Sequence, residues 1–209
     1  MDPLTRLADQ RVLPILRGSE PAALADVVDA VVAGGFDVIE LTLSSLDPIG
    51  DLRGARDRHP TAVLGMGTVL APDQVREVHA AGADFVVTPV TDVAVIDAAV
   101  ACGVPIIVGA LSPTEVLVAH RSGAAAVKIF PAGRLGPGYL TDVGSVMPQV
   151  QLVPTGGIGE ADIDDYLDNG AMAVGLGSSL TGPALRQEPE ALAGLADRVR
   201  VMAGHWSRA

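Results

Sequence analysis

The sequence predicts an α/β fold, a (β/α)8 or TIM barrel, built as a single domain from residues 1–209. Short runs rich in Val, Ile and Leu recur eight times, and each begins 20 to 26 residues after the one before. Ala-rich amphipathic stretches separate these runs, as helices separate the strands of such a barrel. A chain of about 200 residues is also long enough for eight such units around one core.

The predicted strands are continuous apolar runs, which are typical of parallel strands buried on both faces. An open, doubly wound sheet is the alternative, but it does not require eight units of even length, and no Gly-x-Gly-x-x-Gly motif follows the first run. In chain order the predicted strands are Val12–Leu16, Asp37–Leu43, Ala62–Gly67, Asp84–Thr88, Pro105–Gly109, Ala125–Phe130, Gln151–Thr155 and Met172–Gly177.

The predicted helices are recognised by their ends. Pro21–Ala33, Pro72–Ala81 and Asp92–Ala101 are Ala-rich, and a glycine follows each within two residues. Glycine at that place is typical of a left-handed helix end. Ser112 and Glu115 have the spacing of a capping box, so we expect Glu115 to cap a helix rather than to act in a site.

Composition restricts the class of function. A formal net charge of −11 argues against a nucleic-acid groove and against an anionic membrane surface as a partner. Met1–Gln10 is polar, and no apolar run approaches the roughly 18 residues of a membrane span. Because Cys102 is the only cysteine, no intrachain disulfide can form, and we expect a soluble cytoplasmic protein. Cys102 itself is expected to be a small buried filler residue.

Lys128 is the only lysine and lies within the apolar run Ala124–Pro131. Burying an unpaired ammonium group is costly, so a buried lysine is either paired or loses its proton. A neutral lysine is a nucleophile for carbonyl groups. We therefore interpret Lys128 as a functional residue, and a salt-bridged structural lysine is the alternative.

The predicted strand ends are unusually polar, and in a barrel the carboxyl ends of the strands form the site. Inward residues of alternate strands share a layer, so Glu40 on strand two and Lys128 on strand six are expected to lie close together. An ion pair with no chemical role is the alternative. The polar residues at the strand ends are Arg17, Glu40, Thr42, Ser44, Thr68, Thr88, Lys128, Thr155, Ser178 and Ser179.

Glycines follow the last two predicted strands, in Thr155–Ile158 and Gly175–Ser179. Loops at these two places often bind phosphate through backbone N–H groups and a helix N-terminus. By contrast, the four histidines lie outside the strand ends and form no ligand-spaced pair, so neither a metal nor a cofactor is expected.

Six motifs occur in a fixed order between about Val12 and Leu180: Pro14–Gly18, Ile39–Leu43, Gly65–Val69, Val127–Pro131, Pro154–Gly157 and Gly175–Ser178. In these motifs the chain resembles the 2-keto-3-deoxy-6-phosphogluconate (KDPG) and 4-hydroxy-2-oxoglutarate (KHG) aldolases, and also the 6-phosphogalactonate aldolases. The resemblance implies a homotrimer that cleaves a phosphorylated 2-keto-3-deoxy sugar acid to pyruvate and glyceraldehyde 3-phosphate, without a cofactor. It also implies that Lys128 forms the Schiff base and that Glu40 is the acid/base.

The resemblance further implies a set of substrate-binding residues. Arg17 and Thr68 would bind the pyruvyl carboxylate, and Phe130 would pack beside the imine. Thr155 resembles the residue of gluconate-type enzymes, where galactonate-type enzymes tend to have Val. The remaining substrate-binding candidates are Pro89 and the phosphate-binding residues Gly156, Gly157, Gly177 and Ser178.

Ser44 departs from the pattern, because many gluconate-type members carry Arg four residues after the glutamate. This leaves Arg17 with more of the carboxylate binding. Two alternatives to an aldolase for the phosphogluconate substrate therefore remain. One is a pyruvate aldolase with another aldehyde, and the other is a non-catalytic trimeric barrel.

Overall fold

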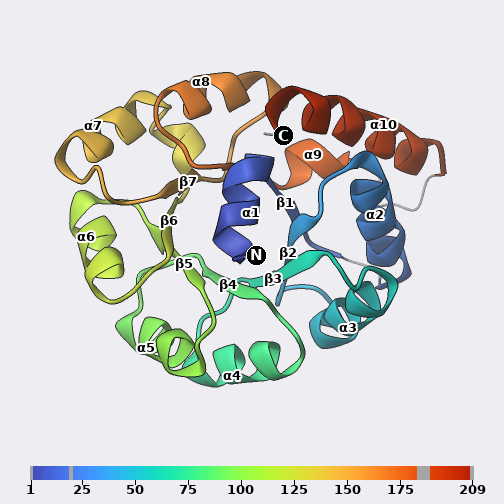
Figure 1. The fold of residues 1–209 in the computed structure, drawn as a ribbon, viewed down its shortest axis with the longest axis horizontal. Coiled ribbons are helices and arrows are strands. Elements are labelled where there is room, and N and C mark those ends of the chain that lie inside the picture. Colours follow the sequence, from blue (N-terminus) through green and yellow to red (C-terminus); the bar gives the residue numbers. More distant parts are fainter. Residues whose placement is uncertain (1, 19–20, 183–188, 208–209) are drawn as a thin grey trace.

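The computed structural model describes residues 2–18, 21–182 and 189–207 of the chain. Eight parallel strands alternate with helices around a barrel (Figure 1), which confirms the predicted (β/α)8 fold. The strands are β1 (Val12–Leu16), β2 (Val38–Thr42), β3 (Val63–Gly67), β4 (Phe85–Thr88), β5 (Ile106–Ala110), β6 (Ala126–Ile129), β7 (Leu152–Pro154) and β8 (Val174–Leu176).

Neighbouring strands pair in chain order from β1 to β7, and β8 pairs with β1. Two isolated bridges, Leu152 to Ala171 and Thr155 to Gly175, join β7 to the β8 segment and complete the ring. Because all strands run in one direction, their carboxyl ends meet at one end of the barrel. The residues that follow the strands are therefore brought together there.

The helices form the outer layer of the barrel. Several begin with proline at the first helical position, where its missing N–H leaves no hydrogen bond unmade. The larger outer helices are α2 (Pro21–Gly34), α3 (Pro48–Arg58), α4 (Pro72–Ala80), α5 (Val93–Cys102), α6 (Pro113–Arg121), α7 (Gly138–Val146), α8 (Ile163–Asp168) and α10 (Pro189–Trp206). The shorter elements are η1 (Ala132–Arg134), η2 (Glu160–Asp162) and α9 (Ser178–Thr181).

Two apolar cores follow from the alternation of side chains along the strands. On β6, Val127 and Ile129 face the helices, whereas Ala126 faces the inside of the barrel. The inner core also contains Phe85 and Val153. Since the inner face of β6 continues from Ala126 to residue 128, Lys128 faces the barrel interior at the carboxyl end.

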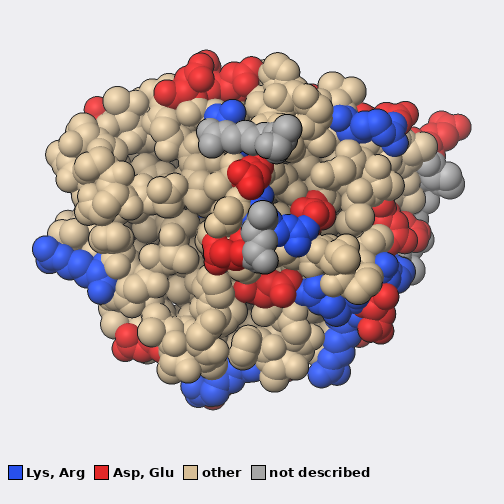
Figure 2. Space-filling view, in the orientation of Figure 1, with Lys and Arg blue, Asp and Glu red and all other residues tan. Residues whose placement is uncertain are grey.

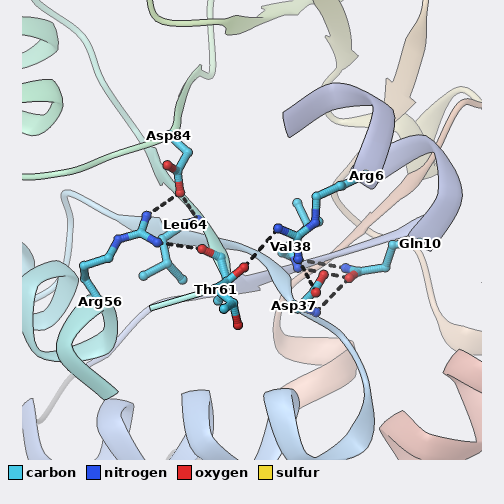
Figure 3. Close-up of polar contacts among 9 residues, drawn as sticks. Arg6, Gln10, Asp37, Val38, Arg56, Thr61, Leu64 and Asp84 are labelled. Carbon is cyan, nitrogen blue, oxygen red and sulfur yellow. Dashed lines mark hydrogen bonds and ion pairs between the residues drawn. The ribbon is translucent and has the colours of Figure 1, made fainter. Parts of the chain in front are cut away.

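The N-terminal helix α1 (Pro3–Gln10) closes the end of the barrel where the strands begin, in the centre of Figure 1. Its Leu7 is buried in the inner core. Gln10 Nε2 donates to the carbonyl oxygens of Val12 (2.7 Å) and Val38 (2.8 Å), and its Oε1 accepts from the Val38 N–H (3.0 Å). The Arg6 guanidinium donates to the carbonyl oxygen of Thr61, which precedes β3, so a second residue of α1 is joined to the end of the barrel where the strands begin (Figure 3).

Charged side chains of both signs surround the centre of this closed end, as Figure 2 shows. Arg6 pairs with Asp37, and Arg56 pairs with Asp84, whose Oδ2 also accepts from the Leu64 N–H (Figure 3). Each guanidinium also donates to a backbone carbonyl, so the pairs hold loops to the strand starts. Within the described ranges, no helix is long and apolar enough to cross a bilayer.

Three details differ from the expectations. The helix α1 was not predicted: its segment has few apolar residues and was described only as polar. Asp2 caps this helix and Pro3 is its first residue. β7 and β8 are shorter than predicted: β7 loses one residue at each end, and β8 loses two residues at its start and Gly177 at its end. Cys102 ends α5 and is only partly buried, because one side of the helix end is open to solvent.

Candidate active site

Lys128 lies at the inner face of β6 with its side chain only 9% exposed. Its Nζ is 3.7 Å from Glu40 Oε1 and 5.6 Å from the centre of the Phe130 ring. The structure therefore brings together the amine and the carboxylate that the shared barrel layer predicted.

Glu40, in the middle of β2, is almost completely buried. Burial raises the pKa of its carboxyl, and the Lys128 ammonium and the Arg17 guanidinium oppose that rise. Among the described residues, none makes a hydrogen bond with Glu40 Oε2. A buried carboxyl with a raised pKa and an unpaired oxygen is suited to exchanging protons with a ligand.

A cavity of about 560 Å³ opens above these two residues at the carboxyl end of the barrel. Every substrate-binding candidate from the sequence lines it. Ser44 and Thr88 are absent from the lining: Ser44 is exposed and contacts Thr42 (3.0 Å), and the Thr88 hydroxyl donates to the Val90 carbonyl. The lining residues are Ile15, Arg17, Glu40, Thr42, Thr68, Pro89, Lys128, Phe130, Thr155, Gly156, Gly157, Ile158, Gly159, Gly175, Gly177, Ser178 and Ser179.

Ile15 and Gly159 line the cavity but were not named from the sequence, and Thr42 and Gly175 were named there only among the polar strand ends and the glycine loops. Simple alternation gives the signal for two of them, because Ile15 is two residues before Arg17 and Thr42 is two residues after Glu40. Gly175 carries no side chain, so its position in the wall of the cavity depends on the folded barrel.

Arg17 and Thr68 follow β1 and β3, on either side of Glu40 in the ring of strands. The Arg17 side chain is exposed toward the mouth, and the Gly18 N–H donates to the buried Ser45 hydroxyl (3.0 Å), which fixes the start of this loop. Thr68 has a φ of +62°, a left-handed conformation that a β-branched residue rarely adopts. This places one cation and one hydroxyl in the lining of the cavity, from the two strands that flank Glu40.

The glycine loops follow β7 and β8, and the β8 loop lies next to Arg17, because β8 pairs with β1 and Arg17 lines a smaller pocket together with Gly177 and Ser178. Gly156 and Gly157 both have positive φ, +90° and +76°, and the Gly133 N–H holds the first of them through its carbonyl oxygen (2.8 Å). In the described part of the chain, no acceptor binds the N–H groups of Gly156, Gly157, Ser178 or Ser179. All four residues line the cavity, and backbone N–H groups without an acceptor are suited to binding an anion.

Metal-ligating side chains are not clustered in the part of the chain that the structure describes. In the ranges that the structure covers, no group of three or more His, Cys, Asp or Glu side chains is placed to hold a metal ion.

Glu115 is confirmed as a capping residue, since its Oε2 accepts from the Ser112 N–H (2.7 Å) and the Leu111 N–H (3.0 Å).

Comparison with known proteins gives consistent matches. The family model described as KDPG and KHG aldolase matches residues 4–193. The chain is 34% identical to the 2-dehydro-3-deoxy-6-phosphogalactonate aldolase of Escherichia coli, over 81% of this chain and 83% of that protein. It is 33% identical to the 2-dehydro-3-deoxy-phosphogluconate aldolase of Pseudomonas aeruginosa, over 78% and 74%. A KDPG aldolase from Legionella pneumophila, solved with pyruvate as a covalent carbinolamine intermediate, superposes with a TM-score of 0.87 at 29% identity, over 95% and 98%.

Proposed function

The chain belongs to the KDPG and KHG aldolase family, and on this premise we propose that it cleaves 2-keto-3-deoxy-6-phosphogluconate, and also its galactonate epimer, to pyruvate and D-glyceraldehyde 3-phosphate. The observation that carries the proposal is the approach of Lys128 Nζ to Glu40 Oε1 inside the cavity. An amine and a proton-transferring carboxylate in one buried site are the two groups that Schiff-base cleavage requires.

In this reaction the Lys128 amine adds to the C2 carbonyl, and loss of water gives a protonated imine. The C3–C4 bond then breaks: its electrons enter the imine to form an enamine, while Glu40 takes the proton of the C4 hydroxyl and the aldehyde leaves. Protonation of C3 and hydrolysis release pyruvate and restore Lys128. Glu40 Oε2 has no hydrogen-bond partner among the described residues, so the carboxyl keeps an acceptor uncommitted for this proton.

The two ends of the substrate position the bond that breaks. Arg17 and Thr68 bind the carboxylate, and Pro89 and Phe130 form the wall beside the imine. Backbone N–H groups of the loops at Gly156–Gly157 and Gly177–Ser178 bind the phosphate. Because remote binding energy helps to orient the reacting carbon, removal of the substrate's phosphate should lower kcat/KM heavily.

Borohydride reduction in the presence of pyruvate tests the Schiff base. Lys128 is the only lysine, so peptide mapping should find one reduced adduct there, with the N-terminal amine as the only competing amine. Pyruvate release is then measured from both epimeric 6-phosphates and from the unphosphorylated acids. An unmodified Lys128 with full activity would exclude the Schiff base, and a trapped pyruvate without turnover of any acid would favour a non-catalytic barrel.

A second candidate is the KHG reaction, in which the aldehyde carries no phosphate. The matching family includes KHG aldolases, and Ser44 departs from the gluconate pattern. Equal efficiency on phosphorylated acids and on 4-hydroxy-2-oxoglutarate would favour this candidate.

We also propose that the protein works as a homotrimer, with residues 1–209 as one domain. Exposed apolar side chains in the loops after β3, β4 and β5 and at the start of α5 support a contact between copies: Leu70, Val90, Val93 and Leu111, each at least 44% exposed. Sedimentation should show a trimer that Val93→Glu dissociates. Val146→Glu is the matched control, because Val146 is also exposed but lies on α7.

The cellular setting follows from the proposed substrate. We propose a cytoplasmic location and a role in Entner–Doudoroff-type carbohydrate metabolism, where phosphorylated sugar acids are cleaved to three-carbon products. The single cysteine agrees with a reducing compartment.

A further inference from the structure

Gly67, the last residue of β3, lies under the carboxyl group of Glu40. β2 and β3 run parallel, with Glu40 opposite Gly65 and Thr42 opposite Gly67. A Cβ on residue 67 would overlap Glu40 Oε1, and would lie 2.6 Å from its Cδ and 2.9 Å from its Cγ. These separations are shorter than the 3.0 Å below which real Cβ atoms are essentially never found. The Glu40 carboxyl therefore occupies the space that any side chain at position 67 would need.

The backbone at Gly67 does not itself require glycine. Gly67 lies within a regular strand and is not among the described glycines with positive φ. It also does not line the cavity, because Glu40 covers it. Room for the carboxyl is thus the requirement that the structure places on this position.

A second glycine of β3 shows which way the carboxyl is blocked. Gly65 is covered by the Phe85 ring from the other neighbouring strand, and a Cβ there would lie 2.6 Å from Phe85 Cδ2. The ring fills the barrel below the carboxyl, whereas the cavity lies above it. A Glu40 side chain pushed off Gly67 is therefore expected to move toward the cavity, and its present geometry relative to Lys128 would change.

We propose that Gly67 is a positioning residue for the reaction: its missing side chain lets the Glu40 carboxyl lie flat across β3, with Oε1 3.7 Å from Lys128 Nζ. The inference rests on the acid/base role proposed for Glu40. It predicts that Gly67→Ala misplaces the proton acceptor while the amine and both anion-binding ends stay where they are.

Steady-state kinetics of Gly67→Ala test the proposal. We expect kcat to fall by about 10- to 100-fold, since a misplacement of about 1 Å can cost on the order of 100-fold, while KM changes by less than about threefold. Borohydride trapping of pyruvate on Lys128 should persist. Gly65→Ala is the matched control on the same strand: it should lower the melting temperature through the Phe85 contact but keep kcat close to that of the wild type.

A double-mutant cycle separates positioning of Glu40 from a general loss of structure. In the Glu40→Gln background no carboxylate remains to be misplaced, so adding Gly67→Ala should change kcat by less than about threefold. The same 10- to 100-fold loss in both backgrounds would overturn the proposal, as would wild-type kcat in Gly67→Ala beside an impaired Glu40→Gln. Wild-type kcat in Glu40→Gln would instead overturn the acid/base role itself.

Should Gly67→Ala fail to fold, Glu40→Ala removes all the side-chain atoms that would lie within 3.0 Å of a Cβ on residue 67. Gly67→Ala/Glu40→Ala should then fold and keep kcat within about threefold of Glu40→Ala alone. A double variant that still fails to fold would show that position 67 excludes a side chain for another reason, and the proposal would be wrong.

Discussion

Thr155 at the end of β7 lies across Gly175 of β8, and a Cβ on residue 175 would overlap Thr155 Oγ1 and lie 3.1 Å from its Cβ. Because Gly175 has no side chain, the buried Thr155 can occupy this space and line the cavity. Its hydroxyl donates to the Val153 carbonyl over 3.4 Å, which is long for such a bond. Because this hydrogen bond is long, the Thr155 hydroxyl loses little by bonding to a substrate hydroxyl instead.

Thr155→Val should change the preference between the two C4 epimers. The wild type is expected to cleave both and to favour the gluconate epimer by roughly ten- to thirtyfold in kcat/KM, the worth of about 1–2 kcal/mol from one hydrogen bond. Valine has nearly the same shape without the hydroxyl, so the ratio should shrink or invert. A wild type that prefers the galactonate epimer, or a ratio that Thr155→Val leaves unchanged, would move the selector to the strand-two loop around Ser44.

Glu40→Gln should lower kcat by about 10²–10⁴-fold while pyruvate binding is largely kept, because a positioned acid/base contributes about that factor. Burial raises the pKa of Glu40 from its usual 4.5, so the carboxyl stays protonated to a higher pH than an exposed one. A protonated carboxyl cannot accept a proton, and kcat should therefore fall as the pH is lowered through this raised pKa. The pH profile of kcat should lose this acidic limb in Glu40→Gln; an unchanged limb would assign it to another group.

Thr68→Gly should stabilise the fold and weaken the substrate site together. Threonine is strained in the left-handed conformation at φ +62°, and glycine is not; this gain is larger than the entropy that glycine adds to the unfolded chain. The free energy of unfolding, measured in urea, should therefore rise by about 0.5–1 kcal/mol. Loss of the hydroxyl should raise KM about tenfold. Arg11→Gly is the matched control: Arg11 has φ +64° at the closed end of the barrel, so it should gain stability at constant KM. Equal KM in both variants would remove Thr68 from the carboxylate site.

Glu115→Ala should lower the free energy of unfolding by about 1 kcal/mol at neutral pH, the usual worth of a helix cap. The Ser112 N–H, the Leu111 N–H and the Ser112 hydroxyl all donate to its carboxylate and lower its pKa. A lowered pKa in the folded state means that this stability is present above the usual pKa of 4.5 and is lost as the pH falls through the folded value. The difference from the wild type should accordingly shrink in acid. Glu77→Ala is the matched control: Glu77 is an exposed residue inside α4, so its loss should leave the free energy of unfolding at neutral pH nearly unchanged.

Periodicity was sufficient to predict the barrel, because eight buried strands at even spacing leave few other arrangements. It also predicted that Glu40 and Lys128 would meet, since alternation and the shared layer are properties of every such barrel. α1 was missed because a short helix with two leucines has a weak pattern, although Asp2 and Pro3 carry a readable start signal.

Contacts between neighbouring strands could not be read from the sequence. That Gly67 makes room for Glu40, and Gly175 for Thr155, depends on the stagger between consecutive strands, β2 with β3 and β7 with β8, which no pattern within either strand specifies. A glycine in a strand pattern indicates close approach, but not which side chain approaches.

The first and last helices meet at the closed end of the barrel. The Ser207 hydroxyl lies 3.5 Å from the carbonyl oxygen of Gln10, on the side away from the cavity. A partner protein or a solid support attached beyond either helix would thus be tethered on the same side, behind the catalytic mouth. Immobilised through either end, the enzyme would present its open cavity to the flowing solution.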